Sequence, residues 1–594
     1  MKNAVLPFTL VACLVLTACS RYNNGTAIRL NQVGFAPEQE KTATIDVVSA
    51  KSKPCDVYIL NAAGDTVWQG TASETMLNPV SRKYRQVVDF TSLKEHGTFR
   101  ICVHHRQEVI SSRFQITDNP YRELTRKALR AFYYQRASMD ILEPWAEGYA
   151  RPAGHPDNRV LVHSSASTEE RPEGTEIDSR GGWYDAGDYN KYIVNSGYTM
   201  GVWLLTYQLY ATYFDTLHLN IPESTLQVPD MLSEAMYNLR WMLTMQDADG
   251  GVYHKLTEPD FEGFIRPDQC QKPRYVVMKT TAAALDFAAT MALAARVYAP
   301  YKETYPGFVE AAIDAAKRAY AWAEQHPAIY YDQNAMNEEF APAITTGAYD
   351  DTDVTDEFYW AATELYLTTC DERYKKPVKL RKKQIDTYRP AVWGDVQELG
   401  DMEWMLHPEE DDPHFAIDLK ADLIMYLQPF IDEATHISVH RSPYGNRESD
   451  FFWGCNSEGC CWRGDEMLFA YHLTGDKRYL VNAQRCLNYV LGQNATGYCY
   501  VTGFGSKPVE HPHHRLSFSH PKGTHPGFLC GGPNPMRQDA ETDGVIYPDD
   551  VAADESYLDY QPSYASNEVT INWNVTLFAL SGGLDAIGNP PASK

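Results

Sequence analysis

Between Ile28 and Ile116, apolar and polar residues alternate in short runs. Thr42–Val48, Asp56–Leu60, Gln86–Phe90 and Phe99–Val103 follow this pattern. The turn-forming stretches Ala63-Gly64-Asp65 and His96-Gly97 lie between these runs. Alternation with a period of two, in segments rich in β-branched residues and bounded by turns, is typical of half-buried strands. The pattern predicts a small β-sandwich over residues 27–117.

From Asp118-Asn119-Pro120 onward, the apolar spacing changes from two residues to three or four, and this tripeptide is itself a helix-start signal. About a dozen helical segments are expected, among them Tyr121–Leu142, Leu232–Leu243, Thr280–Tyr298, Phe308–Trp322, Glu357–Leu367, Ala421–Phe430, Asp465–Leu473 and Tyr479–Leu491. So many helices over residues 118–594 favour helix hairpins closed into a ring of two concentric layers. The long loops between them would then gather into a cleft at one end.

The first residues have the features of an export signal. Lys2 supplies a positive charge, and the apolar stretch Val5–Leu16 is too short to span a bilayer. It ends in Leu16-Thr17-Ala18-Cys19, which resembles a bacterial lipobox. This predicts a lipoprotein signal peptide over residues 1–19, lipid attachment at Cys19 and a tether over residues 20–26. We expect an outer-membrane lipoprotein, on a face that the sequence leaves open; a plain secretory signal is the alternative.

Composition and charge limit the possible partners. The 594-residue chain has a net charge of −25, which disfavours binding to nucleic acid. A neutral polysaccharide needs no such attraction, and the 12% aromatic content could provide rings that stack on sugar faces as well as core packing. Twelve cysteines occur without paired C-x-x-C motifs, so a four-cysteine zinc site is not predicted. We expect the chain to act as a monomer.

The first chemically suggestive motif is Gly181-Gly182-Trp183-Tyr184-Asp185-Ala186-Gly187-Asp188. Two carboxylates three residues apart can share one side of a turn and hinder each other's ionisation. They could together hold and deprotonate a water molecule, and small Ala186 and Gly187 would let it approach. The alternative is that Asp188 caps the following helix and Asp185 makes a turn bond.

The second motif contains Asp559, Tyr564 and Glu568, and precedes an apolar helical run. Apolar surroundings raise the pKa of a carboxyl, which suits Glu568 to general acid catalysis. The alternative is a favourable charge in the first turn of a helix. A third motif, Pro512-His513-His514-Arg515, lacks a second set of metal ligands and fits a polar clamp on sugar hydroxyls better than a metal site; a surface histidine run is the alternative.

Together these motifs resemble glycoside hydrolase family 9, once called cellulase family E. The family's Asp-Ala-Gly-Asp motif matches Asp185–Asp188, its Pro-His-x-Arg motif matches Pro512–Arg515, and its acid-bearing segment matches Asp559–Asn574. The segment beginning Arg29-Leu30-Asn31-Gln32 resembles the immunoglobulin-like module that precedes many bacterial members. The resemblance covers nearly the whole mature chain.

The resemblance implies a mainly α fold, an (α/α)6 barrel over residues 118–594 preceded by an immunoglobulin-like β-sandwich. It also implies inverting hydrolysis of β-1,4-glucosidic bonds in cellulose oligomers, mixed-linkage glucan or xyloglucan, by endo action. Asp188 would be the general base, Asp185 would position the water and Glu568 would be the general acid. Substrate-binding candidates are His513, Arg515, Asp559, Tyr564, His254 and Tyr349. Inversion requires an acid and a base about 6.5–9.5 Å apart.

No cofactor is expected for catalysis, but the family often binds structural calcium near the segment that begins Asp356-Glu357. Clustered carboxylates suit hard cations, and a capped helix start is the alternative. Ala137 and Gly154 stand where many relatives have zinc-binding cysteines, so zinc is not predicted. Val575 and Cys499 depart from the family motifs, and we expect these departures to affect only the shape of the sugar-binding subsites.

Two other functions remain open at this stage. One is an exo-acting enzyme that releases glucose, cellobiose or glucosamine from chain ends, because the sequence does not show which loops close the cleft. The other is a non-catalytic glycan-binding lipoprotein, against which the intact carboxylates argue.

Overall fold

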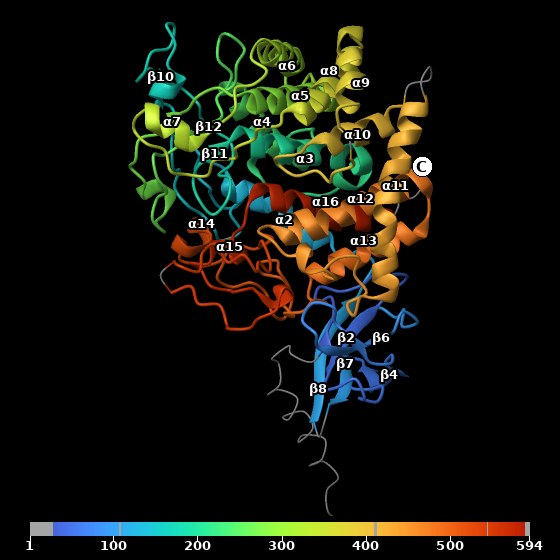
Figure 1. The fold of residues 1–594 in the computed structure, drawn as a ribbon. Helices are drawn as coiled ribbons and strands as arrows, with labels where there is room; N and C mark the ends of the chain where they lie inside the picture. The colour runs from blue at the N-terminus through green and yellow to red at the C-terminus, as the bar shows by residue number, and fades with distance from the viewer. Residues whose placement is uncertain (1–27, 106–107, 386, 409–412, 543, 589–594) are drawn as a thin grey trace, which may run out of the picture.

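The computed structural model describes residues 28–105, 108–385, 387–408, 413–542 and 544–588. A β-rich N-terminal part is followed by a large helical part (Figure 1). The mainly helical fold class with a small β-sandwich is confirmed. The predicted signal peptide, Cys19 and the tether lie outside the described residues.

The N-terminal part consists of two four-stranded antiparallel sheets. The first has the order β1 (Ile28–Arg29), β2 (Thr42–Val47), β6 (Tyr84–Asp89) and β5 (Met76–Leu77), and the second has the order β4 (Thr66–Thr71), β3 (Asp56–Leu60), β7 (Gly97–His105) and β8 (Glu108–Ile116). Between the sheets, Phe35, Phe90 and Phe114 form a buried cluster with ring centroids 5.1–6.0 Å apart. The alternating apolar positions therefore supply the core of a sandwich.

Twelve α-helices in the described part of the chain form the barrel, and they alternate between an outer and an inner layer along the sequence. The outer helices are α2 (Arg122–Gln135), α4 (Asp230–Thr244), α6 (Phe308–Gln325), α9 (Glu372–Lys382), α11 (Pro413–His436) and α13 (Lys477–Val490). The inner helices are α3 (Ile193–Phe214), α5 (Thr281–Tyr298), α8 (Thr355–Thr369), α10 (Gln397–Leu406), α12 (Trp462–Thr474) and α16 (Ile571–Gly588).

The inner helices form a closed ring. Helices α16, α3, α5, α8 and α10 pack in that order, and α12 packs on α16. Between α10 and α12, Trp462 Nε1 donates a hydrogen bond of 2.7 Å to Glu398 Oε2. The inner helices α5 and α16 are buried almost all round, which explains their nearly continuous apolar sequences. Helix α5 is apolar and long enough to cross a membrane by composition alone, but 89% of its most apolar window is buried in the protein.

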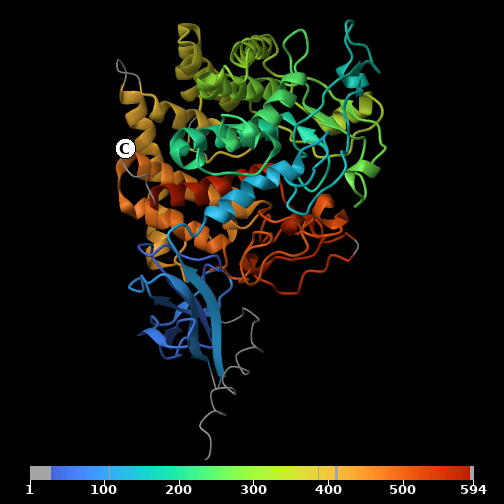
Figure 2. The ribbon, with the colours of Figure 1, turned by 180° about the vertical axis from the view of Figure 1, so that it is seen from behind.

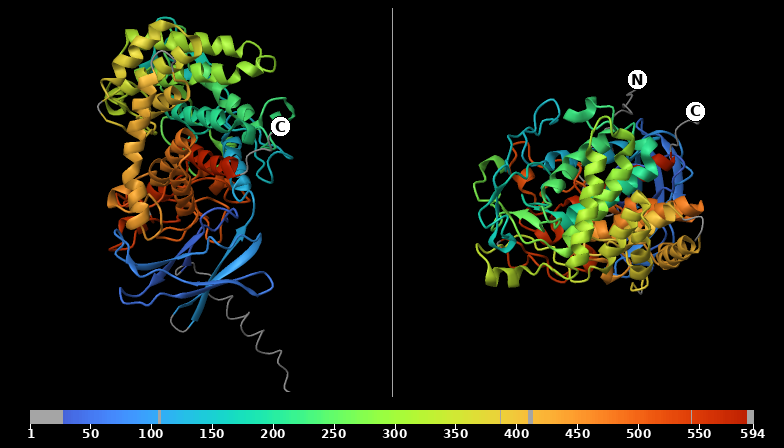
Figure 3. Two further views of the ribbon diagram at one scale, coloured as in Figure 1. Left: turned by 90° about the vertical axis from the view of Figure 1, so that its right-hand side faces the viewer. Right: turned by 90° about the horizontal axis from the view of Figure 1, so that it is seen from above.

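The connections that lead from an outer to an inner helix gather at one end of the barrel. They carry the short helices α7 (Gln333–Glu339), α14 (Arg515–Ser519) and α15 (Tyr564–Asn567), and the short strands β9 (Val160–Val162), β10 (Glu176–Ile177), β11 (Lys191–Tyr192), β12 (Lys255–Thr257) and β13 (Tyr275–Val276). These elements lie on the left in Figure 1 and on the right in Figure 2. At the opposite end, which faces the viewer in the left panel of Figure 3, only residues 370–371 join α8 to α9. The fold thus collects its irregular segments on one side.

The first of these connections begins earlier than the sequence predicts. Helix α2 ends at Gln135, seven residues before the predicted end at Leu142. Arg136 instead pairs with Trp183 in an antiparallel bridge, and its buried guanidinium binds Glu223 and Glu234. These contacts turn the chain toward the Asp185 motif, so tertiary structure overrides the helical periodicity.

The sandwich is fixed to the outer helix α13. Asn31 Nδ2 donates to Asn488 Oδ1 at 2.9 Å, while Asn31 Oδ1 accepts hydrogen bonds from the amides of Val33 and Gly34. Arg485 contacts both carboxylate oxygens of Glu40 at 2.7 Å. Buried, geometrically specific contacts of this kind hold the two parts of the chain in one orientation.

Candidate active site

A cleft of about 330 Å³ opens at the loop end of the barrel. Each of the six outer-to-inner connections contributes to its wall, which is lined by Asp185, Ala186, Asp188, Tyr192, Phe261, Gly347, Ala348, Tyr349, Asp350, Trp393, Trp453, Glu458, Glu568, Thr570, Asn572 and Trp573. All three carboxylates predicted to be catalytic are among these residues. The ring closure of the barrel therefore brings Asp185 and Glu568 together although 382 intervening residues separate them in the sequence.

Asp185 is buried, and both of its carboxylate oxygens are hydrogen-bonded. Asn195 Nδ2 donates to Oδ1 at 2.7 Å, and the Tyr349 hydroxyl donates to Oδ2 at 2.6 Å. Burial and the nearby Asp188 raise the pKa of Asp185 to about 7, although the two donors partly stabilise the charged form. Asn195 lies in α3 and Tyr349 in the connection from α6 to α8, so the Asp185 side chain is oriented by partners outside its own turn rather than by a turn bond.

Asp188 is also buried and lies beside Asp185 in the cleft. Asn190 donates a short hydrogen bond to Asp188 Oδ2, and the Tyr192 hydroxyl donates to the same oxygen at 3.2 Å. Burial raises its pKa, and the Arg515 guanidinium opposes that rise. Helix α3 has no side-chain N-cap, so Asp188 does not cap it.

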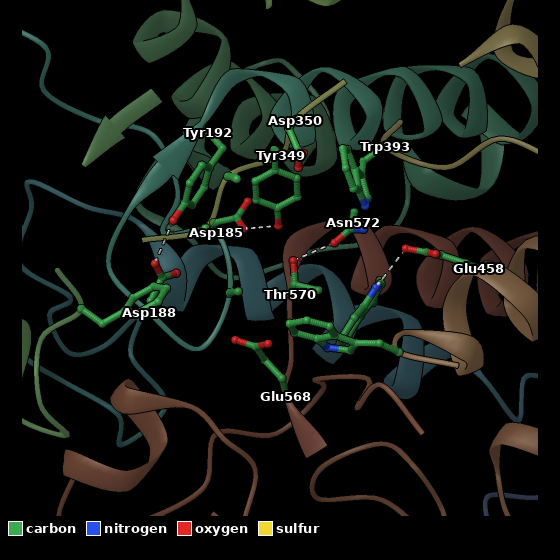
Figure 4. A pocket seen from close by; sticks show the side chains of 16 residues that line it. Asp185, Asp188, Tyr192, Tyr349, Asp350, Trp393, Glu458, Glu568, Thr570 and Asn572 are labelled. Atoms are coloured by element: carbon green, nitrogen blue, oxygen red, sulfur yellow. Dashed lines mark hydrogen bonds between the residues drawn. The ribbon is translucent and has the colours of Figure 1, made fainter. Parts of the chain in front are cut away.

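Glu568 approaches the pair from another wall of the cleft (Figure 4). Its backbone is extended and is paired with His513, and it lies before α16 rather than in the first helical turn. Burial and repulsion from Asp188 and Asp185 raise the pKa of Glu568 to about 8, against the attraction of Arg515. A carboxyl with this pKa retains its proton at neutral pH.

Gly187 has a different role from the one expected. A Cβ atom at this position would lie 2.2 Å from the carbonyl oxygen of His513, so only glycine allows the two loops to meet. The Arg515 amide donates to the Gly187 carbonyl at 3.0 Å, and its Nη1 donates to the same oxygen at 2.9 Å. The Ile571 amide donates to the Asp185 carbonyl at 2.8 Å. Backbone contacts thus lock the Asp185–Asp188 loop to the segment that carries Glu568.

The predicted histidine and arginine contacts lie close to this centre without lining the cleft. His513 Nδ1 is 2.8 Å from the Gln561 carbonyl, and its ring meets Phe264 edge-on at 5.0 Å. Burial, reinforced by Arg515, lowers the pKa of His513 to about 4, so its ring is neutral. Arg515 is buried, and its guanidinium lies over the Phe264 ring at 4.8 Å. Its hydrogen bonds to the protein make Arg515 a support for the loops.

Of the two remaining candidates for substrate contacts, Tyr349 lines the cleft and His254 does not. Tyr349 lines the cleft and orients Asp185 through its hydroxyl. His254 is 1% exposed, and both of its ring nitrogens are occupied: Nε2 donates to the Ala348 carbonyl at 2.8 Å, and Nδ1 accepts from the Thr280 hydroxyl at 3.0 Å. His254 therefore leaves no ring nitrogen for a sugar and instead fixes the loop that carries Tyr349.

Asp559 and Tyr564 are not among the residues that line the cleft. Asp559 accepts hydrogen bonds from the backbone amides of Glu510 and His511, at 3.0 and 2.7 Å. The Tyr564 hydroxyl donates to the Gln538 carbonyl, and its ring packs against Trp453 at 5.6 Å. In this structure Asp559 shapes the histidine loop, and Tyr564 supports an exposed aromatic wall.

Several lining residues were not singled out from the sequence. Trp393, Trp453 and Trp573 provide aromatic surface, and Glu458 adds another carboxyl group. The high aromatic content suggested such rings but could not locate them, since Trp393 and Trp453 lie in loops without a periodic pattern and Trp573 lies in the first turn of the buried helix α16. Phe261 and Trp453 remain 43% and 40% exposed, so the aromatic lining continues to the solvent.

A second acidic cluster lies at the start of α8. Asp356 and Glu357 are buried, and neither Glu357 oxygen has a hydrogen-bond partner among the described residues. Burial raises the pKa of Asp356 to about 7, with further repulsion from Asp395 and Asp351. Asp356 Oδ2 accepts from the Val396 amide, whereas Asp353 receives the Thr355 amide of α8. The buried pair is therefore not explained as a helix cap.

Another group of possible metal ligands includes His155, the residue after Gly154. Ligand atoms of His155, Glu258 and Cys270 lie within 4.8 Å of one another. His155 Nε2 is 3.0 Å from Glu258 Oε1, and its Nδ1 is 2.9 Å from the Tyr184 hydroxyl. These hydrogen bonds already engage both nitrogens of the histidine, which accounts for its burial without a metal.

Comparisons with known proteins cover both parts of the chain. Residues 121–581 match the family model for glycosyl hydrolase family 9, and residues 23–108 match the cellulase N-terminal ig-like domain. The chain is 49% identical to the xyloglucan-specific endo-beta-1,4-glucanase BoGH9A of Bacteroides ovatus, over 94% of each protein. It is 30% identical to endoglucanase D of Acetivibrio thermocellus, over 98% of this chain and 87% of the relative.

Solved structures give the same result. A Bacteroides ovatus GH9 structure matches with a TM-score of 0.89 and 47% identity, covering 95% of this chain and 100% of that one. AaCel9A in complex with cellobiose-like isofagomine matches with a TM-score of 0.82 and 30% identity, covering 94% and 100%. With the family model spanning most of the chain and the motifs lying in one cleft, this protein belongs to glycosyl hydrolase family 9.

Proposed function

We propose that this protein is an endo-acting β-1,4-glucanase that hydrolyses xyloglucan with inversion. The observation that carries the proposal is the placement of Glu568, with a pKa raised to about 8, in the same cleft as Asp185 and Asp188. A protonated carboxyl and a carboxylate pair in one cleft are the groups that acid–base hydrolysis of a glycoside needs. Xyloglucan is the substrate named for the relative that is 49% identical. Both relatives described above are named as endo-acting glucanases, which supports endo action on β-glucans.

In the proposed mechanism, Glu568 protonates the oxygen of the leaving sugar as the glycosidic bond breaks. Asp188 removes a proton from a water molecule, whose oxygen forms the new bond to the anomeric carbon from the opposite face. Asp185, held by Asn195 and Tyr349, accepts a hydrogen bond from the same water and orients it. Glu568 ends the reaction as a carboxylate and recovers its proton from solvent. His513, Arg515 and Asp559 keep the loops in place around these groups.

Replacing either proton-transferring group tests the assignment. Glu568→Gln and Asp188→Asn keep the size of each side chain but remove its acid–base chemistry. We expect turnover of xyloglucan to fall by roughly 10²–10⁴-fold in each variant. Reducing-end release at saturating substrate measures the effect, and Glu510→Gln, which changes an exposed carboxyl near the cleft, is the matched control. Full activity in either catalytic variant would contradict the proposal.

The raised pKa values predict a bell-shaped pH dependence of kcat/KM. Activity should rise with pH as the Asp185–Asp188 pair loses its proton, and fall at higher pH as Glu568 loses its own. Tyr349→Phe removes a donor that lowers the pKa of Asp185, so the acidic limb should move to higher pH while the alkaline limb keeps its position. An acidic limb that stays in place in this variant would show that Asp185 does not control it.

We further propose that a calcium ion is bound by Asp356 and Glu357. Asp286 and Asp351 contribute to the same acidic cluster, and both buried carboxylate oxygens of Asp286 lack a hydrogen-bond partner within the part of the chain that the structure describes. Burial and mutual repulsion raise the pKa of Asp286 and Glu357. A hard divalent cation would compensate this negative charge with the oxygen ligands that it favours.

Calcium binding should appear as a change in thermal stability. A ligand present at 100 times its Kd stabilises the folded state by about 2.7 kcal/mol, so Tm should fall in EDTA and recover when calcium is added. In the double variant Asp356→Asn/Glu357→Gln, Tm should no longer respond to calcium. An unchanged Tm of the wild-type protein in EDTA and in excess calcium would argue against the site.

We also propose that the protein is exported and anchored to the outer membrane through lipid on Cys19. The lipobox-like sequence Leu16-Thr17-Ala18-Cys19 supports this. Acyl chains contribute about 0.8 kcal/mol per buried CH₂, so several chains on one cysteine give a stable anchor. The wild-type protein should partition into the detergent phase of Triton X-114 extracts of its bacterium, and Cys19→Ala should move it to the aqueous phase. Wild-type protein in the aqueous phase would contradict the anchor.

A further inference from the structure

Glu458 is a carboxyl group in the cleft that the proposed mechanism does not use. It lies on a π-helical turn, η6 (Asn456–Cys461), which leads directly into the inner helix α12. Single π-helical turns are uncommon and often occur where a side chain is directed into a functional site. Figure 4 shows Glu458 directed into the cleft on the side away from Asp188, with Thr570 and Asn572 labelled between them.

The protein provides Glu458 with little hydrogen bonding. Trp573 Nε1 donates a hydrogen bond to Glu458 Oε1 at 3.4 Å, which is long for an N–H donor. Burial raises the pKa of Glu458 to about 7, and only the Trp573 donor opposes that rise. A carboxylate that is half-buried in a cleft and weakly hydrogen-bonded has acceptor capacity left for a ligand.

The surroundings of Glu458 have the composition of a sugar-binding subsite. Trp573 and Trp393 supply aromatic surface, and Asn572 supplies an amide. Gly454 has φ +90°, and a Cβ atom there would lie 2.7 Å from Trp573 Nε1, so the backbone passes directly against the indole. The position of Trp573 beside Glu458 is therefore fixed by packing before any ligand binds.

We propose that Glu458 is a substrate-binding residue, whose carboxylate accepts hydrogen bonds from neighbouring ring hydroxyls of a glucosyl unit next to the scissile bond. This inference rests on the proposed function and names a binding contact within the same cleft. The two oxygens of a carboxylate can accept from two adjacent hydroxyls at once, and charge-assisted hydrogen bonds are about twice as strong as neutral ones. The neighbouring indoles would contact the apolar faces of the sugar chain.

Binding to a catalytically inactive protein tests the contact separately from turnover. We would measure Kd for cellotetraose and for a xyloglucan heptasaccharide by calorimetry, in the Glu568→Gln protein and in the same protein carrying Glu458→Ala or Glu458→Gln. Loss of a charged hydrogen-bonding partner should weaken binding by about 10–100-fold in the alanine variant. The glutamine variant should fall in between, because its amide keeps one acceptor oxygen. Glu324→Ala, on the outer helix α6, is the control for an exposed glutamate.

Thermal unfolding separates binding from a structural role. Because the Trp573 hydrogen bond is long, Glu458→Ala should keep the parent Tm while losing affinity. An affinity within twofold of the parent, or a loss of affinity that follows a lowered Tm, would overturn the inference and leave the proposed function standing. Failure of the Glu568→Gln protein to bind either oligosaccharide would contradict the proposed function, and the inference with it.

Discussion

Burial of three carboxyl groups in one cleft is the constraint on which the chemistry depends. Asp185, Asp188 and Glu568 lose hydration and repel one another, so the fold opposes the ionisation of all three at neutral pH. Side-chain hydrogen bonds make the three groups different, because Asn195 and Tyr349 donate to Asp185 and Tyr192 donates to Asp188. These donors oppose the rise at the aspartates, so Asp185, with a pKa of about 7, loses its proton at lower pH than Glu568, with a pKa of about 8.

The barrel tolerates these buried carboxyl groups because different parts of it stabilise the fold and line the cleft. Inner helices such as α5 and α16 are buried almost all round and hold the ring together, while the outer-to-inner connections carry the lining residues. Contacts such as Arg515 to the Gly187 carbonyl then fasten one loop to another. The loops are therefore positioned by a rigid scaffold, although they have little regular structure of their own.

Much of the fold followed from sequence periodicity. The predicted segments Asp56–Leu60 and Thr280–Tyr298 agree closely with β3 and α5, because in both cases one residue spacing persists through the element. The end of α2 was predicted too late, since Arg136 leaves the helix to bind Glu223 and Glu234 from distant segments. The spacing of apolar residues along the sequence cannot predict an ion pair between distant segments.

The site residues also divide into those that sequence motifs identified and those whose position depends on long-range contacts. Motifs with a recognisable order identified Asp185, Asp188 and Glu568 as candidates, and the structure places all three in the cleft. His254 matched a plausible position, but burial and two hydrogen bonds to the protein make it a support for the Tyr349 loop. Glu458 could not be found in this way, because its role depends on the π-helical turn and on Trp573, which lies 115 positions away.

In the proposed mechanism, Glu568 and Asp188 act from opposite faces of one sugar ring, and water attacks the anomeric carbon directly. The most direct measurement is proton NMR of the first product formed from a soluble β-glucan, before the anomers equilibrate. Direct attack by water predicts that the new reducing end appears first as the α-anomer. Initial appearance of the β-anomer would mean a covalent intermediate and would contradict the assigned roles of Asp188 and Glu568.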